Sequence, residues 1–129
     1  MNFLLDTHAL LWALTDPTRL GSEARRLITA QSSTLVVSAA TAWEIGTKQR
    51  LGKLPQADVL VGGYQRHLNR LGAIRLPITE EHALFAGGLD WTHRDPFDRM
   101  LAAQAMLESL TLLTDDAELT NLPGLSTVW

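Results

Sequence analysis

Short apolar runs alternate along the chain with segments in which apolar residues recur at helical spacing. The runs at 3–5, 34–38 and 110–113 are brief and lack polar alternation, which predicts strands buried on both faces. Further strands are expected at 73–76 and 127–129. Helices are expected over 7–14, from a Ser22 cap to about 31, over 39–51, over 57–71, from 79 onward and over 95–109, with a helical turn at 116–119.

Residues that stop or start helices lie between these elements. Asp16-Pro17 ends the first helix, and Gly52 stands where a left-handed C-cap is wanted. Pro96 takes the first position of a helix, where no intrahelical hydrogen bond is lost. Gly62-Gly63 weakens the 57–71 segment, which we nevertheless expect to be helical.

The alternation of strands and helices predicts the fold class. Apolar strands separated by helices are typical of a parallel sheet covered on both faces. We therefore expect an α/β protein, a three-layer α/β/α sandwich with a central, mainly parallel sheet. The 129 residues contain no internal repeat, low-complexity segment or linker, which predicts a single domain over 1–129.

Composition narrows the class of protein. The chain is 46% hydrophobic and has no cysteine, which favours a folded core and excludes disulfide scaffolds and thiolate metal sites. A net charge of −3 excludes nucleic-acid binding through bulk positive charge, so any such activity must lie in a local site. There is no basic, apolar leader and no run near the ~20 apolar residues that span a bilayer. We therefore expect a cytoplasmic protein that does not enter membranes.

Acidic residues stand where open parallel sheets bind ligands, beyond the carboxyl ends of the strands. Four separate segments contribute them: Asp6, Glu44, Asp95 with Asp98, and Asp115 with Asp116. Clustered carboxylates repel one another unless they are protonated or hold a hard cation, and oxygen ligands without cysteine favour Mg²⁺ or Mn²⁺. Such an ion activates water and stabilises charge on a phosphoryl group, which suggests phosphodiester hydrolysis.

Each acid also has a purely structural interpretation. Capping of the following helix would explain three of them, Asp6, Asp95 and Asp116. Glu44 can pair with Lys48 one turn further along a helix surface. Asp98 is harder to explain in this way, because it heads a small apolar stripe at 101, 102 and 105, where an acid without a function is costly. The set therefore carries more weight than any one member.

Four segments resemble PIN-domain ribonucleases of the VapC type, the toxins of type II toxin–antitoxin modules. They are Leu4–Trp12, Ser38–Ile45, His93–Leu101 and Leu112–Ala117. The similarity continues to the final Val128-Trp129 and so covers essentially the whole chain. Four blocks in the family's order are far more specific than any one of them alone.

The resemblance implies a small α/β/α sandwich with an acidic pocket at one edge of its parallel sheet. The family's acids fall on Asp6, Glu44, Asp98 and Asp116. Asp6, Asp98 and Asp116 would hold Mg²⁺ or Mn²⁺, directly or through water. Glu44 would complete the pocket and help to position or deprotonate the attacking water. The implied activity is an endoribonuclease that leaves 5′-phosphate and 3′-hydroxyl ends.

Five further residues are candidates around this set. Thr7 and Thr114 resemble the family's hydroxyls that orient ligands or water. Arg99 is a candidate for contacting a carboxylate or the phosphate, with a surface role as the alternative. Asp95 is a cap or an outer ligand. Asp115 departs from the family pattern, which often has Arg or another residue there, and its extra charge could alter affinity for metal or RNA.

Other polar and aromatic residues are assigned structural roles. His8 is assigned to packing or to a place beside the metal ligands, and Trp12 and Trp43 to the core or an interface. Lys48 is assigned to a solvated face, with a phosphate contact as the alternative. A place near the substrate is the less favoured alternative for His93.

The resemblance also implies partners: a second copy of the chain, a VapB-type antitoxin whose tail enters the acidic groove, and an RNA substrate. The apolar helix at 7–14 and the 57–71 segment are the expected contact surfaces.

Other function classes fit less well. A response-regulator receiver needs two adjacent acids after the first strand and a late Lys, and a haloacid-dehalogenase-type phosphatase needs Asp-x-Asp where His8 stands. A PIN domain that only binds, without catalysis, stays open.

Overall fold

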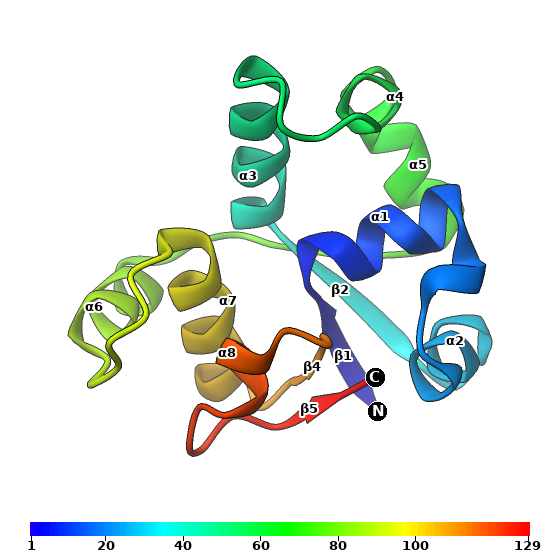
Figure 1. Cartoon of the computed structure of the whole chain (residues 1–129). Coiled ribbons are helices and arrows are strands. Elements are labelled where there is room, and N and C mark those ends of the chain that lie inside the picture. Colours follow the sequence, from blue (N-terminus) through cyan, green and yellow to red (C-terminus); the bar gives the residue numbers. More distant parts are fainter.

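Five parallel strands form the centre of the molecule, and the computed structural model describes all residues, 1–129 (Figure 1). The strands, in the spatial order β3-β2-β1-β4-β5, are β1 (Asn2–Leu5), β2 (Thr34–Ser38), β3 (Ile74–Leu76), β4 (Thr111–Leu113) and β5 (Thr127–Val128). On the central strand β1, Leu4 is in register with Val36 of β2 and Leu112 of β4. An all-parallel sheet between helices confirms the predicted α/β class.

Helices cover both faces of this sheet (Figure 1). One face is covered by α1 (Thr7–Thr15), α2 (Ser22–Thr29), α4 (Ala57–Val61) and α5 (Tyr64–Leu71). The other is covered by α7 (Pro96–Leu107) and α8 (Ala117–Thr120), with α6 (Glu80–Gly88) packed on α7. The helix α3 (Ala39–Arg50) contacts α1, α4 and α7, and a short 3₁₀ segment, η1 (Pro17–Arg19), joins α1 to α2. No helix has both the length and the apolar character needed to cross a bilayer.

Side-chain alternation along β1 divides the core in two, because successive residues of a strand face opposite sides of the sheet. Phe3 and Leu5 pack with α1, α2, α4 and α5. Leu4 packs with α7 and α8 on the opposite face. All three are buried, which explains why this strand has no polar alternation.

Two helices differ from the prediction. The 57–71 segment is two helices, α4 and α5, because the chain breaks at Gly62-Gly63 and Gly63 adopts a left-handed conformation with φ 109°. Ser22 is the first residue of α2 and not its cap; Gly21 takes the cap position, and the helix ends at Thr29. Neither difference moves the strand ends at which the acidic residues lie.

Candidate active site

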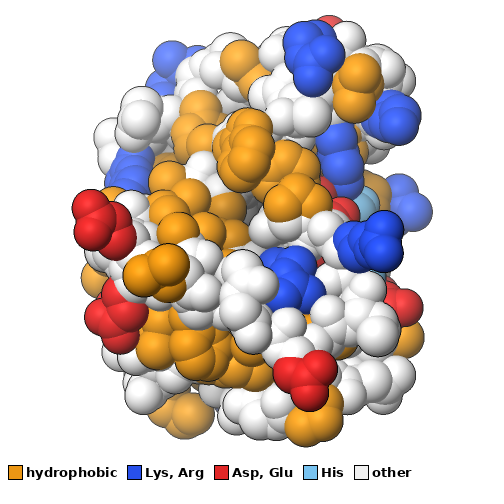
Figure 2. Space-filling view, turned by 90° about the vertical axis from the view of Figure 1, so that its left-hand side faces the viewer, with side chains coloured by type: hydrophobic (Ala, Val, Ile, Leu, Met, Phe, Trp, Pro, Cys, Tyr) orange, Lys and Arg blue, Asp and Glu red, His pale blue; other side chains and the backbone are white.

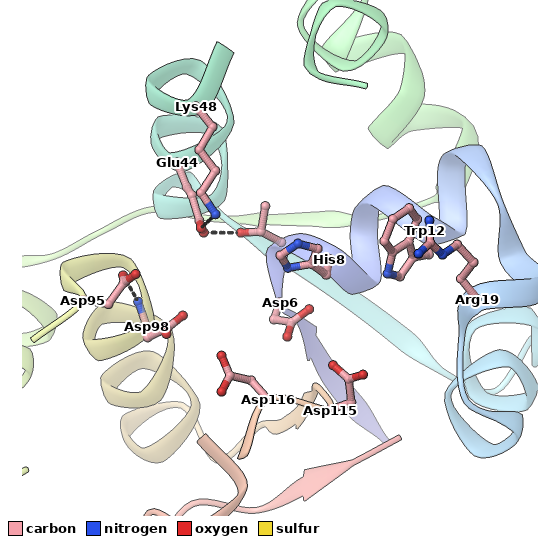
Figure 3. Close-up of a pocket in the computed structure, with 11 residues that line it drawn as sticks. Asp6, His8, Trp12, Arg19, Glu44, Lys48, Asp95, Asp98, Asp115 and Asp116 are labelled. Atoms are coloured by element: carbon pink, nitrogen blue, oxygen red, sulfur yellow. Dashed lines mark hydrogen bonds and ion pairs between the residues drawn. The ribbon is translucent and has the colours of Figure 1, made fainter. Parts of the chain in front are cut away.

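An acidic cavity of about 470 Å³ opens at the carboxyl edge of the sheet (Figure 3). It lies where β1 and β4 end and where α3 and α7 approach them, at the edge where parallel α/β sheets bind ligands. The structure brings all six acids singled out in the sequence to its wall: Asp6, Glu44, Asp95, Asp98, Asp115 and Asp116. They come from four segments that are far apart in the chain.

Asp6 both caps a helix and lines the cavity. Its side chain is 6% exposed, and Oδ1 accepts a hydrogen bond of 2.7 Å from the Ala9 amide at the start of α1. Burial raises the pKa of this carboxyl to about 7, although the Thr114 hydroxyl and the Ala9 amide stabilise its charged form. The negative charges of Asp115 and Asp98 raise the pKa further. Asp6 therefore changes its charge near neutral pH.

Glu44 is held in the wall by two donors. The Thr7 hydroxyl at the start of α1 donates to its Oε1, and Nζ of Lys48 lies 2.7 Å from its Oε2. The pair with Lys48 suggested by the sequence therefore exists, but on the cavity wall and with Glu44 buried. Thr7 thus orients a cavity carboxylate, and Lys48 brings a positive charge to the site.

Asp98 is paired with a histidine. Nε2 of His93 lies 2.7 Å from Oδ2 of Asp98, in the segment that leads into α7. Burial raises the pKa of Asp98, while the hydrogen bond with His93 lowers it and the neighbouring charges of Asp95, Asp116 and Glu44 raise it. The same hydrogen bond raises the pKa of His93. The hydrogen bond with His93 offsets part of the cost of placing the Asp98 carboxylate at the start of the buried apolar stripe of α7.

Asp95 and Asp116 also cap helices. Oδ1 of Asp95 accepts hydrogen bonds from the amides of Phe97 and Asp98, and Oδ1 of Asp116 accepts from Glu118. The buried hydroxyl of Thr114 in turn accepts from the Asp116 amide. Because a carboxylate has two oxygens, a cap at one leaves the other available to a ligand in the cavity.

Arg99 does not line the cavity. Its guanidinium donates to five backbone carbonyls, those of Ala86, Gly87, Leu89, Trp91 and His93. These carbonyls belong to the end of α6 and to the loop that follows it, where helix geometry leaves carbonyls without partners. Arg99 pairs with no carboxylate, and because backbone carbonyls take its donors we assign it a structural role.

The cavity also has a wall that the sequence analysis did not assign to it. His8, Trp12 and Arg19 line the side formed by α1 and η1 (Figure 3). The Arg19 guanidinium lies over the Trp12 ring, 4.0 Å from its centroid. The spacing of His8 and Trp12, one helical turn apart, was the available signal that they share a face.

The donor set suits a hard divalent cation. All the candidate ligands are oxygens, and the pKa values of Asp6 and Asp98 are raised by burial and by neighbouring acids, repulsion that a cation would relieve. As the side chains stand, no three acidic or histidine groups are arranged around a single ion position. An ion here would be held partly through water molecules or after rotation of these side chains.

Comparison with known proteins identifies the family of this chain. Residues 3–125 match the model of the PIN domain family. The chain belongs to the PIN domain family. Members of this family are nucleases that generally use divalent metal ions. No curated protein matches the sequence significantly.

Solved structures with this PIN fold are similar over nearly their whole length. VapBC2 of Rickettsia felis, bound to a promoter DNA fragment, matches with a TM-score of 0.70 and 17% identity, over 99% of this chain and 98% of that one. A toxin–antitoxin complex of Klebsiella pneumoniae matches with a TM-score of 0.66 and 20% identity, over 98% of this chain and 95% of that one. VapBC-1 of nontypeable Haemophilus influenzae matches with a TM-score of 0.63 and 18% identity, over 99% of this chain and 97% of that one. At these identities the likeness concerns the fold.

Proposed function

We propose that this PIN domain is a metal-dependent endoribonuclease, the toxin of a type II toxin–antitoxin module. The observation that carries the proposal is the convergence of six carboxylates on one cavity at the carboxyl edge of the sheet. Two of them, Asp6 and Asp98, have raised pKa values, which is characteristic of sites built for a cation or for proton transfer.

Asp6, Asp98 and Asp116 are the residues that would hold Mg²⁺ or Mn²⁺. When bound, such an ion supplies a water of lowered pKa and offsets the charge that develops on the phosphoryl group. Asp6 would give up its proton on loading, because metal ligands must be deprotonated. Glu44, fixed by Thr7 and Lys48, would orient the attacking water and accept its proton at a carboxylate oxygen.

Replacing Asp116 with Asn tests the metal site. Asn keeps a side-chain oxygen for the Glu118 amide, so α8 stays capped, but one negative ligand is lost. We expect RNA cleavage in Mg²⁺ or Mn²⁺ to fall by about a hundredfold or more. Calorimetric titration with Mn²⁺ should show correspondingly weaker binding. Asp90→Asn is the matched control, since Asp90 is exposed and outside the cavity.

Three results would count against the proposal. Cleavage that persists at the normal rate in excess EDTA would exclude a metal-dependent mechanism. Equal activity of Asp116→Asn and Asp90→Asn would show that Asp116 is not a metal ligand needed for cleavage. Metal binding by the wild type without cleavage of any RNA would favour a PIN domain that only binds.

The proposal includes an antitoxin and a second copy of the chain as partners. The similar structure from K. pneumoniae is a toxin–antitoxin complex, and the one from R. felis is VapBC2 bound to a promoter DNA fragment. Apolar side chains gather on the face that includes α6 (Figure 2), and Leu84 there is 78% exposed. The apolar residues of α1, an expected contact surface, instead lie largely in the core. Exposed apolar patches of this kind mark protein contacts.

We propose that the α6 face is where two copies meet, and a pair of variants tests it. Leu84→Glu should convert a dimer to monomers in light scattering coupled to gel filtration, because a buried charge opposes association. Val59→Glu places the same charge at an exposed position of α4, and it should leave the dimer intact. If only Val59→Glu gave monomers, the contact would lie on the 57–71 segment expected from the sequence.

A further inference from the structure

Arg19 is a cation of the cavity that has no partner within the chain. Only two lining residues carry a permanent positive charge, Lys48 and Arg19. Lys48 is paired with Glu44 at 2.7 Å. The Arg19 side chain makes no ion pair and donates no hydrogen bond, and its one close interaction is with the Trp12 ring. Its guanidinium N–H donors are therefore free to bind a ligand.

Trp12 holds this guanidinium in place. The cation lies 4.0 Å from the ring centroid, a separation at which attraction to the ring face is favourable. Stacking restricts a side chain that would otherwise lose much conformational freedom on binding, which lowers the cost of ligand capture. Trp12 itself belongs to α1, the helix that begins directly after Asp6. Asp6, at the start of α1, and the ring that stacks on Arg19 are thus carried by the same helix.

The position of Arg19 matters because the cavity is otherwise strongly acidic. Six carboxylates would repel the phosphates of an approaching RNA strand wherever no cation stands between them. In Figure 3 the Trp12–Arg19 wall lies across the cavity from Asp95 and Asp98. A strand whose cleaved bond sits among the acids would meet Arg19 on the α1 side.

We propose that Arg19, stacked on Trp12, binds a backbone phosphate of the RNA strand on the α1 side of the cavity. Arg19 is then a substrate-binding residue, distinct from the acids that act at the cleaved bond. Its planar fork suits the paired oxygens of a phosphate better than a lysine would. The inference rests on the proposed endoribonuclease function and extends it to how the strand is held.

Arg19→Gln and Arg19→Lys test this role, with Arg70→Gln as the control. Arg70 is exposed on α5, outside the cavity, and its replacement removes the same charge. We expect Arg19→Gln to raise KM for a single-stranded RNA about tenfold, with kcat within about twofold. Arg19→Lys should lie between Arg19→Gln and the wild type, and Arg70→Gln should match the wild type.

Binding provides a second measurement that does not need turnover. In an Asp6→Asn background, fluorescence anisotropy with a labelled single-stranded RNA gives Kd at several salt concentrations. One lost phosphate contact should reduce the slope of log Kd against log salt by about 0.7. If Arg19→Gln left both KM and this slope equal to those of Arg70→Gln while the wild type cleaved RNA, the Arg19 proposal alone would be overturned.

Two other outcomes also decide the matter. A fall in kcat at constant KM would give Arg19 a part in the chemical step instead of strand binding. Polyglutamate serves as an acidic peptide probe, because a guanidinium also binds carboxylates. Inhibition by polyglutamate that disappears in Arg19→Gln, with RNA binding unchanged, would assign Arg19 to a protein partner. A wild type that cleaves no RNA would instead overturn the proposed function.

Discussion

Asp6→Asn is expected to abolish RNA cleavage, lowering its rate about a thousandfold or more, while making the metal-free protein more stable at neutral pH. The loss follows from removing a buried carboxylate of the cavity, a proposed metal ligand, since a bound ion contributes several kcal/mol to the stabilisation of developing charge. The Asn side chain keeps an oxygen for the Ala9 amide, so the cap of α1 is retained.

The gain in stability follows from the pKa of Asp6. In the folded protein this pKa is raised to about 7, whereas the ordinary value is 3.8. Between these values the folded state holds a proton that the unfolded chain has released, so raising the pH destabilises the wild type. Asn carries no charge and avoids this penalty. The advantage of the variant should grow from pH about 4 to 7, reach a few kcal/mol and then level off.

Thermal unfolding in EDTA at a series of pH values measures this difference. The wild type should lose more of its Tm than Asp6→Asn as the pH rises from about 4 to 7, and Mg²⁺ should restore Tm in the wild type only. Asp90→Asn, at an exposed site, should follow the wild type throughout. A folded Asp6→Asn protein that cut RNA at the normal rate would end the assignment of the site.

Arg99→Ala is expected to destabilise the fold by about 3 kcal/mol. The change leaves five carbonyls of α6 and the following loop without their donor, and hydrogen bonds to charged groups are stronger than neutral ones. Arg94→Ala is the control, since Arg94 is exposed in the same loop and forms no hydrogen bond or ion pair. Urea unfolding gives both values, and hydrogen exchange should rise across 88–95 in Arg99→Ala alone.

This result separates the two roles considered for Arg99. If it bound phosphate, its loss would leave stability unchanged and raise KM. We instead expect a stability loss with a weaker effect on activity, transmitted through the His93 carbonyl that Arg99 holds and the adjoining pair of His93 with Asp98. Stability equal to that of Arg94→Ala would contradict the structural role.

The strands and the acidic edge were predictable from the sequence because both follow from local signals. Burial on both faces produces the apolar runs at 3–5 and 34–38, and the acid directly after the first strand must lie at its carboxyl end. The break between α4 and α5 was underestimated, because consecutive glycines in a short segment permit either one weak helix or a turn.

The pairings within the site were harder to predict. Arg99 bonds to backbone carbonyls, which leave no side-chain signature, and the stacking of Arg19 on Trp12 depends on how η1 turns back along α1. The contact of His93 with Asp98 spans five positions across a helix start, a separation that matches no helical period. Tertiary geometry, and not local periodicity, decides such contacts.

The double use of Asp6, Asp95 and Asp116 affects how mutational scans of this molecule should be interpreted. Alanine at these positions deletes a charge and also removes the N-cap of a helix. An inactive alanine variant therefore does not show whether activity was lost through misfolding or through loss of the carboxylate. Asparagine separates the two effects, since it retains the acceptor and removes only the charge. Isosteric scanning is therefore the informative design for this cavity.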